Sequence, residues 1–196
     1  MPRRFRNARR SGFLKPKKFF IIATEGALTE KIYFDEFKPP REAAFQIKVL
    51  ENKKHKTRPK QVFERLVSYS AEFALASDDE LWLVIDRDSW AENELDEVAQ
   101  LIGKRSNFYL ALSNPSFELW LFLHFAENRP FNYRHQILPE LKRLFGAYEK
   151  GDYDASKCVQ FVQKAIERAN ALDLQPGDAW PKAQGSRVYL LMKKLI

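Results

Sequence analysis

Two short apolar runs, each ending in acidic residues, constrain the fold more than any other feature of this sequence. Residues 19–24 (FFIIAT) lead into Glu25, and residues 81–85 (LWLVI) lead into Asp86 and Asp88. Such short, bulky, β-branched and aromatic runs predict buried strands of a parallel sheet. The carboxyl ends of these strands form the ligand crevice of an open α/β fold, so three carboxylates are expected on one rim. Because strand side chains alternate, we expect Asp86 and Asp88 to point the same way.

Strand-like and helical patterns alternate around these two runs. Apolar spacing predicts helices over residues 28–37, 61–76 and 92–103, and further strands over residues 45–50 and 107–112. This alternation predicts a right-handed, mostly parallel α/β sheet flanked by helices, with a helical C-terminal part. The expected organisation is a basic arm (1–17), an α/β core (18–127) and a helical extension packed on the core (128–196).

The segment after the last predicted strand is apolar on nearly every side. Residues 114–125 therefore predict a buried helix, with Pro115 in its first turn and Asn114 or Ser113 as its cap. His124 on this helix is expected to be a hydrogen-bonded core histidine. Three more helices are predicted over residues 136–148, 155–172 and 186–196, with a Pro- and Gly-containing connection over 175–185.

Composition excludes several classes of protein. The single cysteine, Cys158, rules out an internal disulfide and, with only three histidines, does not favour a zinc site. No run of 18 apolar residues and no apolar signal segment is present, so neither a membrane span nor secretion is expected, and the cytoplasm is the expected location. The sequence leaves the oligomeric state open.

Positive charge is concentrated in two segments. The first 18 residues contain eight Lys and Arg and no acidic residue, which accounts for the net charge of +7. A second basic stretch, residues 53–60, lies between a predicted strand and a predicted helix, where phosphate contacts would suit it. A basic arm is also often only a solvated chain end. The residues expected to bind nucleic acid are Arg3, Arg4, Arg6, Arg9, Arg10, Lys53, Lys54, Lys56 and Arg58.

Paired aspartates at a strand end suit a hard divalent cation. Mg²⁺, or Mn²⁺ in its place, takes oxygen ligands and commonly uses one or two carboxylates together with substrate phosphate. A bound metal would neutralise phosphodiester charge while a nearby glutamate moves a proton. The alternatives are a polar strand end or helix cap for Asp86 and Asp88, and a surface turn for Glu25.

Four other polar residues lie near these positions in the predicted fold. Glu30 either faces the site or stabilises the start of its helix. Glu118, on a buried helix, either completes the acidic site or pairs with Arg87 or a lysine. Asn114 and Ser116 either contact a phosphate or cap the helix.

Several motifs together resemble the RloB family. They are TEGALTEKIYF at residues 24–34, IDRD at 85–88, SNPSFELW at 113–120, HF at 124–125 and YEK at 148–150. The resemblance covers about residues 15–195, and residues 184–187 (QGSR) depart from the usual family pattern. It implies a Toprim-like fold, in which Glu25 is a general acid or base or a metal ligand, and Asp86 and Asp88 hold Mg²⁺. It also implies a bacterial antiviral effector encoded beside an AAA-type ATPase, in restriction or abortive-infection loci.

Two functions from different classes remain at this point. The first is a Mg²⁺-dependent Toprim-like nuclease that cuts RNA (for example tRNA) or DNA under the control of an ATPase partner. The second is a non-catalytic nucleic-acid-binding or regulatory subunit of such a complex. Convergence of Glu25, Asp86 and Asp88 on one point would favour the nuclease.

Overall fold

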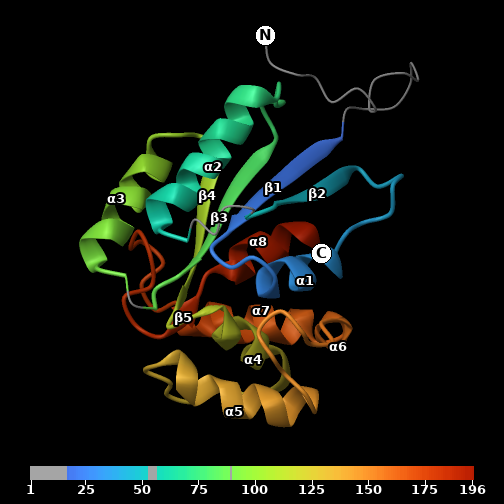
Figure 1. The fold of residues 1–196 in the computed structure, drawn as a ribbon, viewed down its shortest axis with the longest axis vertical. Helices are drawn as coiled ribbons and strands as arrows, with labels where there is room; N and C mark the ends of the chain where they lie inside the picture. The colour runs from blue at the N-terminus through green and yellow to red at the C-terminus, as the bar shows by residue number, and fades with distance from the viewer. Residues whose placement is uncertain (1–16, 53–56, 89) are drawn as a thin grey trace.

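The computed structural model describes residues 17–52, 57–88 and 90–196 and shows a mixed α/β fold (Figure 1). Its sheet contains β1 (Lys18–Thr24), β2 (Phe45–Leu50), β3 (Glu80–Asp86), β4 (Phe108–Asn114) and β5 (Gly185–Ser186). The strand order is β2-β1-β3-β4-β5; β5 is antiparallel to β4 and the other neighbours are parallel. The predicted α/β class with a mostly parallel central sheet is therefore confirmed.

Helices cover both faces of this sheet. They are α1 (Thr29–Asp35), α2 (Pro59–Glu72), α3 (Glu92–Gly103), α4 (Phe117–Phe125), α5 (Arg134–Phe145), α6 (Ser156–Val159), α7 (Val162–Leu172) and α8 (Val188–Leu195). Helices α2 and α3 lie on one side, whereas α1, α4, α7 and α8 lie on the other (Figure 1). No helix in the described ranges is long and apolar enough to cross a membrane.

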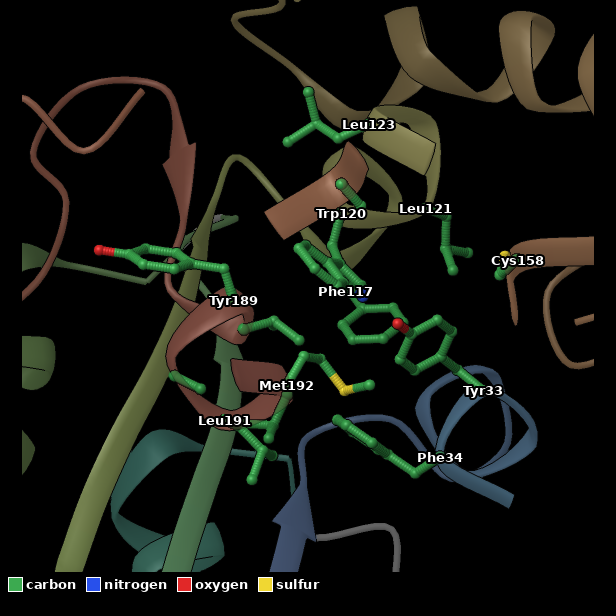
Figure 2. Close-up of a cluster of buried hydrophobic side chains, with 14 of the residues drawn as sticks. Tyr33, Phe34, Phe117, Trp120, Leu121, Leu123, Cys158, Tyr189, Leu191 and Met192 are labelled. Carbon is green, nitrogen blue, oxygen red and sulfur yellow. The ribbon is translucent and has the colours of Figure 1, made fainter. Parts of the chain in front are cut away.

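Alternation along the strands divides the core between these two faces. Ile21 packs with α2 and α3, whereas its neighbour Ile22 packs with α1, α4 and α8. In Figure 2, aromatic residues of α1 and α4 meet aliphatic residues of α8, including Leu191 and Met192. Helix α4 is apolar on nearly every side because it is packed between β4 of the sheet and helices α5 and α7.

His124 lies within this core, as the sequence predicts. Its Nε2 is 3.1 Å from the Tyr33 hydroxyl and its Nδ1 is 2.9 Å from the Trp120 carbonyl oxygen. Burial lowers the pKa of His124 to about 4. The ring is therefore neutral at pH 7 and acts as a structural residue.

Three local predictions are wrong. Strand β4 continues to Asn114, the Asn114–Pro115 peptide bond is cis, and α4 begins only at Phe117. The helix predicted over 155–172 is divided, because Phe161 N donates to the Cys158 carbonyl three residues back and the chain then restarts as α7. Residues 185–186 form an edge strand rather than part of a connection.

Candidate metal and catalytic site

Neighbouring strands bring Glu25 and Asp86 into direct contact. Strands β1 and β3 pair in parallel up to Thr24 opposite Val84, so both acids follow the same edge of the sheet. The Asp86 backbone N–H donates to Glu25 Oε2 at 3.1 Å. Trp90 Nε1 lies 3.2 Å from both Glu25 carboxylate oxygens and donates to them. Glu25 is partly exposed at the end of β1, where these two residues hold its carboxylate.

Asp86 is fixed by the start of α4. The Phe117 backbone N–H donates to Asp86 Oδ1 at 2.8 Å. This N–H belongs to the first turn of α4, where backbone N–H groups have no acceptor within the helix. Asp86 thereby caps a helix that begins 31 residues later in the sequence.

Glu30 turns back toward the strand end from the first turn of α1. Its Oε1 accepts a hydrogen bond from the Gly26 backbone N–H at 3.1 Å, and its side chain is buried. The other oxygen, Oε2, is buried with no hydrogen-bond partner in the described part of the chain. A Cβ atom on Gly26 would collide with this carboxylate, so glycine leaves the room that Glu30 occupies.

Glu118 has a different partner from those expected. Arg134 at the start of α5 pairs with it at 2.6 Å, and the Tyr148 hydroxyl donates to the same oxygen at 3.3 Å. Neither Arg87 nor a lysine takes this role in the described structure. Glu118 remains part of the acidic site, because its charge also acts on Asp86.

The four acids Glu25, Glu30, Asp86 and Glu118 form one cluster, called the acidic cluster below. Burial raises the pKa of Glu25 to about 7, and the charges of Glu30 and Asp88 add to this effect. Burial also raises the pKa of Asp86 well above its usual range, with further contributions from Glu25 and Glu118. The pKa of Glu30 is raised by burial too. Buried carboxylates that repel one another hold protons that exposed ones would release.

Asp88 is exposed and lies beside the acidic cluster, where its charge acts on Glu25. Strand β3 ends at Asp86, and Asp88 has a φ of 30°, so strand alternation does not set its direction and the argument for parallel side chains fails. Positive φ is uncommon for residues other than glycine, although aspartate tolerates it better than most. The Asp88 backbone N–H donates to the Pro115 carbonyl at 2.9 Å, which ties this turn to the loop before α4.

The donor set fits a hard divalent cation, although only in part. Within residues 17–52, 57–88 and 90–196, no three acidic, histidine or cysteine side chains are arranged to hold a metal ion. Mg²⁺ needs only one or two protein carboxylates when substrate oxygens and water complete its shell. The contacting pair of Glu25 and Asp86, with Asp88 beside it, meets that requirement.

The other predicted site residues lie outside the cluster. The Asn114 side-chain amide donates to the carbonyls of Pro181 and Lys182 and neither caps α4 nor meets an acid. Ser116 precedes α4, but its buried hydroxyl has no partner among the described residues, so the expected side-chain cap is absent there. Arg58 precedes α2 and lines a separate surface pocket with Lys60. The other predicted nucleic-acid-binding residues, Arg3, Arg4, Arg6, Arg9, Arg10, Lys53, Lys54 and Lys56, lie outside the described residues.

Two arginines belong to the site although the sequence analysis assigns them no role. Arg134 neutralises Glu118, and Arg65 on α2 donates to the Thr24 carbonyl at the end of β1. Burial lowers the pKa of Arg65, and the negative charge of nearby Glu30 partly opposes this lowering. A lone arginine on an otherwise ordinary helix gives no sign in the sequence that it faces an acid, because the contact depends on how the helices pack.

The fold and the acidic cluster can be compared with known proteins. No curated protein and no solved structure matches the chain. The family model described as RloB-like protein matches residues 20–195, which include every member of the acidic cluster. The chain therefore belongs to the RloB-like family.

Proposed function

We propose that this protein is a metal-dependent nuclease of Toprim type, with Mg²⁺ or Mn²⁺ as its cofactor. The observation that carries the proposal is the hydrogen bond from the Asp86 backbone N–H to Glu25, which places two partly buried carboxylates that repel each other at the carboxyl ends of neighbouring parallel strands. Burial of like charges costs stability unless a cation offsets it. A divalent cation is the simplest group that would do so in a phosphodiesterase.

The residues of the site would have distinct roles in this reaction. Glu25, Asp86 and Asp88 would hold the metal, which when bound supplies positive charge to the phosphate and orients the attacking and leaving oxygens. Without metal the pKa of Glu25 is about 7, and a bound cation would lower it. Glu25 would therefore act either as a metal ligand or as the group that moves a proton. Trp90 orients the Glu25 carboxylate through its indole N–H. Arg134 pairs with the Glu118 carboxylate at the edge of the site.

The cellular role is proposed from family membership. We place the protein among cytoplasmic effectors of antiviral defence by abortive infection, acting on RNA or DNA under the control of an AAA-type ATPase partner. Membership of the RloB-like family supports this role. The basic residues of the N-terminal arm suit electrostatic attraction to a nucleic acid.

The test is metal-dependent cleavage of a panel containing tRNA, single-stranded DNA and plasmid DNA. Wild type is compared with Glu25→Gln and Asp86→Asn, and each variant retains one side-chain oxygen that can accept a hydrogen bond. Glu149→Gln serves as the control, because this glutamate is 74% exposed and pairs only with Lys142 in the described structure. We expect cleavage that needs Mg²⁺ or Mn²⁺, is lost in both site variants and persists in the control.

The same panel is repeated with the ATPase partner present, because a partner that holds the nuclease inactive would silence the isolated chain. Metal-independent cleavage, or cleavage that survives both site substitutions, would contradict the proposal. Binding without cleavage in both arms would identify the protein as a non-catalytic binding subunit.

A further inference from the structure

We propose that a pocket beside Asp88 binds one unpaired nucleotide of the substrate, with its base stacked on Tyr133 and its phosphate directed to Arg134. This inference rests on the proposed nuclease function and deepens it, because it assigns the substrate class. The substrate would be single-stranded nucleic acid or an unpaired loop, rather than a continuous duplex.

The pocket lies between the acidic cluster and the start of α5. It has a volume of about 480 Å³ and is lined by Asp88, Pro115, residues 132–135 and Leu138. This volume lies in the usual range for sites that bind small molecules or single nucleotides. Because the charge of Asp88 acts on Glu25 and that of Asp86 acts on Arg134, a nucleotide in this pocket would place its neighbouring phosphodiester close to the acidic cluster.

An aromatic pair forms the outer wall of the pocket. Tyr133 is 62% exposed, and its ring is parallel to that of His135, with centroids 5.5 Å apart and planes 10° apart. An exposed tyrosine that is not covered by the fold presents a face on which a third ring can stack. Nucleobases stack on such faces regardless of sequence, but only an unpaired base has its own face free.

The chain that carries Tyr133 is held rigidly. Gln136 Oε1 accepts hydrogen bonds from the backbone N–H groups of Asn132 at 2.8 Å and Tyr133 at 3.1 Å. Gln184 Oε1 accepts a hydrogen bond from the Phe131 N–H at 2.8 Å. A platform fixed before binding loses less conformational entropy when a ligand arrives.

Arg134 supplies positive charge at the inner end of the pocket. One of its terminal nitrogens pairs with Glu118, while 25% of the side chain stays exposed. A guanidinium has five N–H donors, so pairing with one carboxylate oxygen leaves others for a phosphate. Asp88 also lines the pocket, and its negative charge would repel a phosphate, so the phosphate would be directed to Arg134.

The inference is tested by binding rather than by cleavage. Fluorescence anisotropy with the full chain, in EDTA and 150 mM salt, compares labelled single-stranded RNA and DNA of one sequence with the matching duplexes. We expect Tyr133→Ala to weaken single-strand binding by about 5- to 150-fold, the range measured for base–aromatic stacking. Tyr133→Phe keeps the ring and should bind within about twofold of wild type, as expected if stacking dominates.

Leu174→Ala is the matched control. Leu174 is 82% exposed and does not line the pocket, so its loss should change binding to neither substrate. Thermal unfolding of each variant verifies that the fold is intact. Duplex binding should be weaker than single-strand binding in wild type and insensitive to Tyr133→Ala.

The outcomes separate this inference from the proposed function. Unchanged single-strand binding by Tyr133→Ala, or an equal loss on duplex, overturns the nucleotide pocket even if wild type still cleaves. Tyr133-dependent binding by a wild-type protein that never cleaves with any metal supports the pocket and overturns the nuclease. Absence of single-strand binding by wild type also overturns the pocket.

Discussion

Replacing Glu25 by glutamine should stabilise the metal-free protein at pH 8 and not at pH 5. The pKa of Glu25 is raised in the folded state, so between its unfolded value of 4.5 and about 7 the folded protein binds more protons than the unfolded chain. Stability from this residue is therefore fully present below pH 4.5 and is lost as the pH rises through about 7. Glutamine stays neutral at every pH, so the Glu25→Gln variant does not lose stability in this way.

The size of the effect follows from the pKa and the hydrogen bonds. A rise from 4.5 to about 7 corresponds to roughly 3 kcal/mol at 1.36 kcal/mol per unit. Glutamine keeps only one acceptor oxygen for the N–H groups of Asp86 and Trp90, which removes about 1 kcal/mol. The net expectation is about 2 kcal/mol of added stability at pH 8, and little change or a small loss at pH 5.

Urea unfolding in EDTA at the two pH values measures this difference. Glu149→Gln is again the control, because its exposed carboxylate should give the same small change at both pH values. If Glu25→Gln changes the free energy of unfolding equally at pH 5 and pH 8, the acidic cluster does not raise the pKa of Glu25. If the pKa of Glu25 is raised as expected, adding Mg²⁺ at pH 8 should stabilise wild type more than Glu25→Gln.

Three further outcomes test other parts of the structure. Trp90→Phe removes the indole donor that favours charged Glu25, so in EDTA the pH at which Glu25 destabilises the fold should move up by about one unit in urea unfolding; an unchanged pH dependence would exclude this contact. Because the pKa of His124 falls from 6.5 to about 4, wild type should lose about 3 kcal/mol as the pH drops through that window, and His124→Gln should lack this loss in acid titrations. Arg187→Met leaves Asp173 buried without its cation and should cost about 3–5 kcal/mol in urea unfolding, whereas a cost below about 1 kcal/mol would mean that the pair is solvated.

The strand ends of the site could be predicted because each is encoded locally. The runs before Glu25 and Asp86 are continuous and bulky, which only a strand buried on both faces requires. Once both runs are parallel strands, their carboxyl ends share an edge. Adjacency in the sheet then brings the two acids into contact without further information.

The partners of these acids could not be predicted, because they depend on packing between distant elements. Nothing near Glu118 in sequence indicates Arg134, which reaches it only because α5 folds back across α4. The division between α6 and α7 could not be predicted from the apolar pattern either. Cys158 and Val162 keep helical spacing, so the apolar pattern continues across a change in backbone hydrogen bonding.

Stability and function should respond differently at the two contacting acids. Glu25 accepts hydrogen bonds from the Asp86 backbone N–H and the Trp90 indole N–H, but its buried charge mainly opposes folding. Asp86 also repels its neighbours, but its carboxylate caps α4, so truncation to alanine would leave the Phe117 N–H without an acceptor. Asp86→Ala should therefore destabilise the fold and abolish cleavage together, whereas Asp86→Asn keeps an acceptor oxygen and removes only the charge. A fold that places one candidate metal ligand on a helix end secures that ligand without metal, while a bound cation would relieve the charge repulsion at both Glu25 and Asp86.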